Sequence, residues 1–122
     1  MNIFHVSSEV FPYSKTGGLA DMTAALAKAQ AKDGHKVKLV TPLYRGILDR
    51  FSDLEPSDIE FSVPLGQAEH TVTIRQLTHS KNLTVLFVDQ PEFFDRANVY
   101  GEEDDAERFI FFSKCAVRLA KN

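Results

Sequence analysis

The sequence predicts an α/β protein in which a parallel sheet carries an antiparallel hairpin insertion. Three observations support this class. A strand, a helix and a second strand follow one another within residues 1–40, which is the length of a right-handed parallel unit. Two partly alternating segments flank a glycine-marked turn near residue 66, as in a hairpin. A continuous apolar segment around residue 85 then indicates another buried strand.

The first 40 residues predict the parallel unit. Met1 to Ser7 is an apolar segment that favours a buried strand. Leu19 to Asp33 favours a helix that ends at Gly34. Alanine fills many of its positions, so the helix can lie close to a sheet. Lys36 to Val40 is the second strand, closed by Thr41-Pro42. Spacings of three and four residues place one apolar face of the helix at Leu19, Met22, Leu26 and Ala29.

The middle of the chain predicts a short helical turn and then the hairpin. The turn lies within Leu43 to Phe51. The hairpin strands are Ile59 to Val63 and Thr71 to Leu77, joined through Pro64-Leu65-Gly66-Gln67. Asn82 to Asp89 is apolar enough for a strand that is buried on both faces.

The last part of the chain predicts a single turn at Pro91 to Asp95, a polar loop, and a long helix from Ala106. Acidic residues crowd the start of this helix and basic residues its second half, which suits the helix dipole. Phe109, Phe111 and Phe112 cannot all face one sheet, because successive helical residues are about 100° apart. We therefore expect at least one of these rings to be exposed unless a second chain covers it.

Size and charge narrow the functional classes. The chain has 122 residues, one domain at most, and its 14 basic and 17 acidic residues leave a net charge of -3. This balance does not resemble the basic surface of a nucleic-acid binder, and no basic amphipathic helix suggests a membrane surface. We expect no nucleic-acid or membrane partner.

The remaining composition predicts a soluble cytoplasmic protein. No signal peptide and no apolar segment of about 20 residues is recognisable. No transit peptide is seen either. Cys115 is the single cysteine and the four histidines are scattered, so we expect neither a disulfide nor a metal site.

The segment Lys15-Thr16-Gly17-Gly18 lies in the connection between the first predicted strand and the first predicted helix. The free amides of a first helical turn and the helix dipole favour an anion there, and glycine allows a close approach to the backbone. A tight turn in which glycine only relieves strain is the alternative. The glycine spacing fits neither a Walker loop nor a dinucleotide-binding fingerprint.

The longer pattern around this loop resembles the N-terminal segment of bacterial glycogen synthases and plant starch synthases. The matching motifs occur in the same order over nearly the whole chain. Asp104-Asp105 departs from the Asp-Asn that is usual in the family. The matching residues are Ser8-Glu9, Pro12, Lys15 to Asp21, Asp33-Gly34-His35, Thr41-Pro42, Tyr44, Phe94-Asp95-Arg96, Tyr100-Gly101 and Ala106-Glu107-Arg108-Phe109.

This resemblance implies a retaining glucosyltransferase with two Rossmann-like domains facing across a cleft, the glycosyltransferase B fold. Residues 1–122 would be part of the first domain, with no second domain in this chain. The substrates would be ADP-glucose and the non-reducing end of an α-1,4-glucan such as glycogen or starch, without a metal or other cofactor. The rest of the same enzyme would cover the last helix, and residues 1–122 alone would be inactive. If the source is a plant, the resemblance implies that the enzyme lies in the plastid.

The resemblance also implies roles for residues of the loop. Lys15 would be the charged contact to ADP-glucose, Gly17 and Gly18 would give access to the backbone, and Thr16 would supply a hydroxyl. Asp21 is either a site residue or an acid that complements the helix dipole.

Two further residues would lie on the acceptor side, namely Glu9 and Tyr100. For Glu9 the alternative is a tether that only holds the loop, and for Tyr100 it is an ordinary surface tyrosine. A different functional class also stays open, a stand-alone module that binds a nucleotide sugar or phosphate without catalysis.

Overall fold

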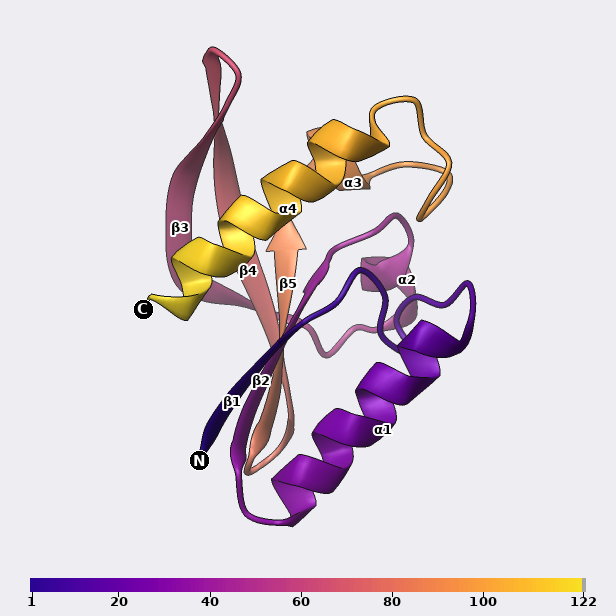
Figure 1. Ribbon diagram of the computed structural model, residues 1–122, viewed down its shortest axis with the longest axis vertical. Helices are drawn as coiled ribbons and strands as arrows, with labels where there is room; N and C mark the ends of the chain where they lie inside the picture. The colour runs from indigo at the N-terminus through magenta and orange to yellow at the C-terminus, as the bar shows by residue number, and fades with distance from the viewer. Residues whose placement is uncertain (122) are drawn as a thin grey trace.

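The computed structural model describes residues 1–121, which form one sheet, two long helices and two short ones. The strands are β1 (Asn2–Val6), β2 (Lys36–Pro42), β3 (Glu55–Leu65), β4 (Ala68–Ser80) and β5 (Leu83–Asp89). The helices are α1 (Gly18–Lys32), α2 (Ile47–Arg50), α3 (Pro91–Phe94) and α4 (Asp105–Ala120). Figure 1 shows α1 beside the parallel strands and α4 beside the β3–β4 hairpin.

The strand order is β1-β2-β5-β4-β3. β1, β2 and β5 are parallel, with Ile3 opposite Val37 and Val37 opposite Leu83. β4 runs antiparallel to both β5 and β3. The predicted fold class is confirmed, including the parallel pairing of the first two strands.

The two long helices cover opposite faces of the sheet. His5 of β1 and Gln30 of α1 share a hydrogen bond of 2.6 Å, which places α1 over the face that carries His5. His5 is paired across the neighbouring strands with Leu39, then Val85, then Leu77 of β4, so Leu77 lies on the same face of the sheet as His5. His70 lies seven residues from Leu77 and therefore points to the other face, where its ring packs edge-on against Phe111 of α4. The architecture is a three-layer α/β/α arrangement.

The orientation of α1 corrects the sequence prediction. The expected core face is exposed, with Leu19, Met22 and Leu26 at 43%, 56% and 43% exposure. Ala29 is exposed as well. Both faces repeat at spacings of three and four residues, so periodicity could not choose between them. The face that packs on the sheet is made of small residues, which allow a close approach: Ala20, Thr23, Ala24, Ala27 and Ala31.

The hairpin is longer than the sequence predicted. β3 and β4 pair from the Leu65–Ala68 end, where Gly66 adopts a φ of 64°, to Glu60 opposite Thr73. After a register shift between Pro56 and Glu60 the pairing resumes and reaches Glu55 opposite Gln76. The prediction followed the alternating apolar residues alone. Backbone pairing continues beyond them through polar positions, because ladder hydrogen bonds do not depend on the side chain.

The central apolar part of α4 is mostly buried. Phe111 and Phe112 lie in the core and Phe109 is partly buried beside the Tyr100 ring, so the expectation that one of these rings is exposed is wrong. The large apolar residues of α4 that are exposed are Ile110 and Val117, at 52% and 57%. Cys115 is fully buried as a small apolar side chain, and burial raises the pKa of its thiol to about 12. Within residues 1–121, none of the helices combines the length and the apolar character that crossing a bilayer requires.

Candidate functional site

The segment from Ser7 to Gly17 leaves the carboxyl end of β1 and leads into α1. Its start is tied to the sheet, because the Ser7 amide donates to the Val40 carbonyl of β2 at 3.0 Å. In open parallel sheets the carboxyl ends of the strands are where ligands bind. The predicted position of the glycine loop is therefore confirmed.

A buried turn supports the loop from below. The Val10 carbonyl accepts hydrogen bonds from the amides of Tyr13 and Ser14, both at 2.9 Å. The Tyr13 ring packs edge-on against Phe51 and Phe87, at centroid distances of 4.8 and 5.1 Å. This anchor leaves the following residues, 15–18, at the surface.

Lys15 is half-exposed and pairs with Asp21 of the first helical turn. The Lys15 Nζ lies 2.5 Å from Asp21 Oδ2, and the two side chains are 47% and 49% exposed. The ammonium also lies 5.6 Å from the centre of the Phe11 ring. Exposed ion pairs of this kind contribute about 0–1 kcal/mol, so an incoming anion could compete for Lys15 at little cost.

Glu9 is the buried carboxylate beneath the loop, with 1% exposure. Its Oε2 accepts a hydrogen bond from the Thr16 hydroxyl at 2.6 Å. Its Oε1 accepts from the backbone amides of Thr16 and Gly17 at 3.3 and 3.2 Å. These are the contacts of a tether. The acceptor-side role stays a prediction for Glu9, but its carboxylate is buried here and already bonded within the protein.

The hydrogen bonds of Glu9 decide its charge. Burial raises the pKa of the carboxyl, but the hydrogen bonds from Thr16, Tyr100 and the amides of Thr16 and Gly17 outweigh burial, and the pKa is lowered. Glu9 is therefore ionised at neutral pH. The Thr16 hydroxyl donates to this charge, so its predicted contact to a substrate competes with an existing strong hydrogen bond.

The first turn of α1 is open to an outside ligand. Gly17 is the N-cap residue, with an extended backbone at φ -163°, and no side chain within residues 1–121 caps the turn. The amides of Gly18, Leu19 and Ala20 have no partner within the helix, and those of the exposed residues Gly18 and Leu19 are the ones that an outside ligand can reach, because Ala20 is buried.

Neither glycine of the loop is required by the fold. Gly17 and Gly18 lie outside the positive-φ region that favours glycine. A Cβ built on either residue meets no atom of the described chain within 4 Å. The alternative in which glycine relieves backbone strain therefore has no support. Space is left free above the backbone, as a closely approaching ligand would need.

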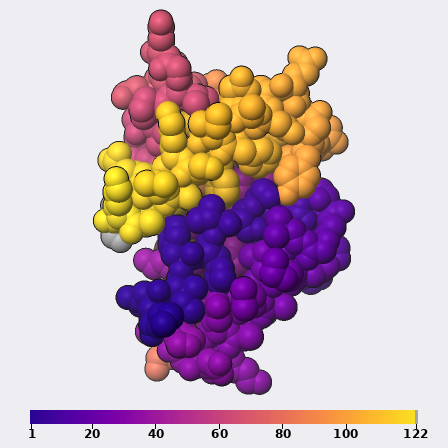
Figure 2. Space-filling model, in the orientation of Figure 1, coloured from indigo at the N-terminus to yellow at the C-terminus, as the bar shows by residue number. Residues whose placement is uncertain are grey.

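Tyr100 comes from the loop before α4 and meets the β1 side of the site. Its hydroxyl hydrogen-bonds the Ser8 hydroxyl, and the Ser8 carbonyl accepts from the buried Tyr44 hydroxyl at 2.6 Å. Figure 2 shows the orange segment that precedes α4 lying directly against the indigo N-terminal part of the chain. Two loops that are about 90 residues apart in sequence thus form one surface.

Arg108 holds the Tyr100 loop and is the residue that sequence reasoning missed. It is fully buried, and its guanidinium donates to the carbonyls of Phe93 and Val99 at 2.6 and 3.2 Å. It also donates to Asp105 Oδ1 at 2.7 Å. Asp105 in turn accepts from the amides of Gly101 and Glu102, which lowers the pKa of its carboxyl. The signal available in the sequence was an arginine directly before the apolar segment 109–112 and three residues after Asp105.

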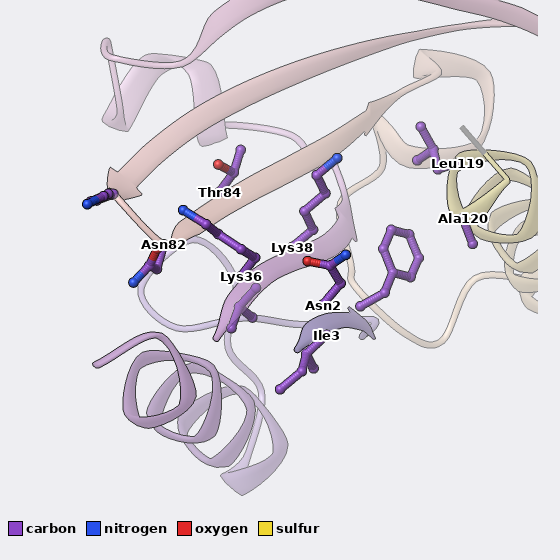
Figure 3. Close-up of a pocket in the computed structure, with 11 residues that line it drawn as sticks. Asn2, Ile3, Lys36, Lys38, Asn82, Thr84, Leu119 and Ala120 are labelled. Atoms are coloured by element: carbon purple, nitrogen blue, oxygen red, sulfur yellow. The ribbon is translucent and has the colours of Figure 1, made fainter. Parts of the chain in front are cut away.

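A hollow of about 470 Å³ lies at the other end of the parallel strands, away from the glycine loop. Figure 3 shows Asn2, Lys36 and Lys38 around it, with Leu119 of α4 at its side. It opens at the amino ends of β1 and β2, where parallel sheets rarely bind ligands. Among residues 1–121, no group of three histidine, cysteine or acidic side chains is placed to hold a metal ion.

The structure brings the sequence-predicted site residues together at one edge of the sheet. Those on the β1–α1 side surround the uncapped helical turn, and the last one reaches them from the loop before α4: Glu9, Lys15, Thr16, Gly17, Gly18, Asp21 and Tyr100.

Comparison with known proteins identifies similar chains. Residues 2–122 match the family model of the starch synthase catalytic domain. The chain is 40% identical to a glycogen synthase of Finegoldia magna and 41% identical to one of Opitutus terrae, with 99% of the chain aligned in each case. It spans about a quarter of the length of these relatives, 25% and 26%.

A solved structure shares the fold. The catalytic domain of starch synthase IV from Arabidopsis thaliana, solved with ADP and acarbose bound, superimposes with a TM-score of 0.81 at 32% identity. The match covers 96% of this chain and 24% of that one.

Proposed function

Because the chain belongs to the starch synthase catalytic domain family, we propose that it is the N-terminal part of a glycogen or starch synthase. The full enzyme transfers glucose from ADP-glucose to the non-reducing end of an α-1,4-glucan, with retention of configuration. Residues 1–122 contribute part of the first of two Rossmann-like domains. The coverage of about a quarter of each relative supports this assignment.

The observation that carries the proposal is the pair of glycines with no structural reason to be glycine. Gly17 and Gly18 leave an open approach to the uncapped first turn of α1, and Lys15 stands beside it. Negative charge grows on the diphosphate as the sugar leaves. A lysine and helix amides that are already in place stabilise that charge most at the transition state.

The other predicted residues take supporting places in this proposal. Asp21 holds the Lys15 ammonium near the turn until the donor binds. Tyr100 borders the acceptor side through its contact with Ser8. Thr16 holds the loop in place through its hydrogen bond to Glu9, and it contacts the donor directly only if that bond is given up.

The experiment compares Lys15→Ala, Lys15→Gln and Lys28→Ala in the full-length protein. We expect Lys15→Ala to lower turnover with ADP-glucose at least ~10²-fold, the scale for losing one preorganised donor. Lys15→Gln should recover little, because it keeps length without charge. Lys28 is exposed on the same helix, and its substitution should leave kcat and KM unchanged. Wild-type kcat/KM in Lys15→Ala would contradict the proposal.

Gly18→Ala separates function from folding. The new methyl meets no protein atom, and alanine is favoured over glycine in a helix, so Tm should stay constant or rise. The KM for ADP-glucose should rise, because the methyl occupies the approach to the amides. A protein that binds ADP but transfers no glucose would instead favour the non-catalytic binding module.

A further inference from the structure

The loop already holds one anion of its own. The carboxylate of Glu9 is buried under Thr16 and Gly17 and accepts their two backbone amides together with the Thr16 hydroxyl. Successive amides that converge on one carboxylate form the same concavity that binds phosphate in other proteins. Glu9 therefore fills the part of the glycine loop that sequence reasoning offered to the substrate.

This internal occupant divides the amides of the loop into two groups. Those of Thr16 and Gly17 point inward to Glu9. Those of the first turn of α1, beginning at Gly18, have no side-chain cap within residues 1–121. An outside diphosphate can use the second group without displacing the buried carboxylate.

The tether also determines where Lys15 stands. Lys15 directly precedes Thr16, whose amide and hydroxyl are both bound to Glu9. Three hydrogen bonds on two neighbouring residues restrict the backbone that carries Lys15 and Gly18. The loop is fixed before any ligand arrives, and a site that needs no reordering loses less affinity to conformational entropy.

We propose that Glu9 is a positioning residue for the sugar-nucleotide donor, acting through Thr16 and Gly17 on Lys15 and the first-turn amides. This inference rests on the proposed function. Glu9 itself touches neither donor nor acceptor in this role, in contrast to the acceptor-side place that the family resemblance implied for it.

The test uses Glu9→Gln, Thr16→Val and Thr16→Ser in the full-length protein. Glutamine keeps the shape of Glu9, but it presents an NH₂ group to the Thr16 and Gly17 groups that donate hydrogen bonds to Glu9. It also removes the negative charge that accepts those bonds. We expect the kcat/KM for ADP-glucose to fall about 10²-fold, the scale of a small misplacement of reacting groups. The KM for the glucan should change less than about threefold in the same preparation.

The two Thr16 variants test the same Glu9–Thr16 hydrogen bond by changing its donor. Thr16→Val removes the hydroxyl at constant shape and should reproduce much of the loss in Glu9→Gln. Thr16→Ser keeps the hydroxyl and should lose less than Thr16→Val. The double variant Glu9→Gln/Thr16→Val should be little worse than the poorer single variant, because both remove one shared bond. Glu103→Gln, an exposed carboxylate in the loop before α4, serves as the unchanged control.

Calorimetric titration with ADP distinguishes the two possible failures. If the wild-type protein neither binds ADP nor uses ADP-glucose, the proposed function fails. If the wild type does both and Glu9→Gln keeps its ADP affinity and its kcat/KM for ADP-glucose, the proposed function stands and this inference is overturned. Should Glu9→Gln not fold, equal kinetics for Thr16→Val and Thr16→Ser would overturn it in the same way.

Discussion

At the scale of single residues, two buried charged side chains hold the two loops of the site. Glu9 gathers the amides of the loop after β1, and Arg108 gathers the carbonyls of the loop before α4. The Glu9 carboxylate is compensated by backbone amides of its loop, and the Arg108 guanidinium by backbone carbonyls of the other loop. Burying a charge is costly unless it is hydrogen-bonded in this way, so a movement of either loop that breaks these bonds is unfavourable.

Removing the Arg108 guanidinium should be strongly destabilising. Arg108→Met leaves the carbonyls of Phe93 and Val99 without their donor and Asp105 without its partner. We expect a loss of about 3–5 kcal/mol in the free energy of unfolding, measured by urea denaturation. Arg108→Lys should rescue little, because one ammonium cannot reproduce the planar set of donors.

Arg118→Met is the matched control for this prediction. Arg118 is exposed on the same helix and contacts the Phe61 ring at 5.3 Å. Its replacement should cost about 1 kcal/mol or less. Equal stability losses in the two variants would show that burial of Arg108 is not the cause.

At the scale of single elements, α1 shows how packing distance selects a face. The alanine face lies on the sheet, while Leu19, Met22 and Leu26 point outward. A close approach to the strands brings the first turn of the helix against the carboxyl end of β1. The orphan amides of Gly18 and Leu19 are thereby held beside Lys15.

This packing predicts opposite results for two alanines of the same helix. Ala27→Leu places three extra carbons at a position with 0% exposure and should destabilise the protein by about 1–3 kcal/mol. Ala29→Leu adds the same atoms at an exposed position and should change stability by no more than about 0.5 kcal/mol. Thermal and urea unfolding of both variants check the difference. A larger loss in Ala29→Leu would favour the face that periodicity suggested.

At the scale of the whole molecule, the candidate site is an open edge. The loops that contain Lys15 and Tyr100 meet at the carboxyl end of β1, and β1 pairs only with β2 within residues 1–121. The relatives are about four times as long as this chain. In the proposed function the site holds both a sugar nucleotide and a glucan, and such a site needs protein groups on more than one side.

We therefore expect residues 1–122, produced alone, to transfer no glucose from ADP-glucose above the uncatalysed background. The donor would have Lys15 and the helix amides on one side and no group to orient it or exclude water on the other. Incorporation of labelled glucose into glycogen measures this, with the full-length protein as the positive control. Transfer by the short chain would contradict the proposed division of the site.

The order of elements and the place of the glycine loop followed from local patterns. Apolar segments, alanine content and a Lys-Thr-Gly-Gly sequence before a helix are properties of neighbouring residues, and the sheet class and the β1–α1 junction were confirmed. The hairpin ends extended past the apolar alternation that revealed it, because backbone pairing tolerates polar residues.

What the sequence by itself determined was therefore the fold class, the family and the loop that faces the donor in our proposal. Only the tertiary structure decided which face of α1 is buried, that Glu9 occupies the amides of Thr16 and Gly17, and that Arg108 fixes the loop of Tyr100. Periodicity records that a helix has apolar faces, but the distance to the sheet selects one of them. Hydrogen-bond partners such as Ser8 and Tyr100 are joined only by folding, so no local pattern contains them.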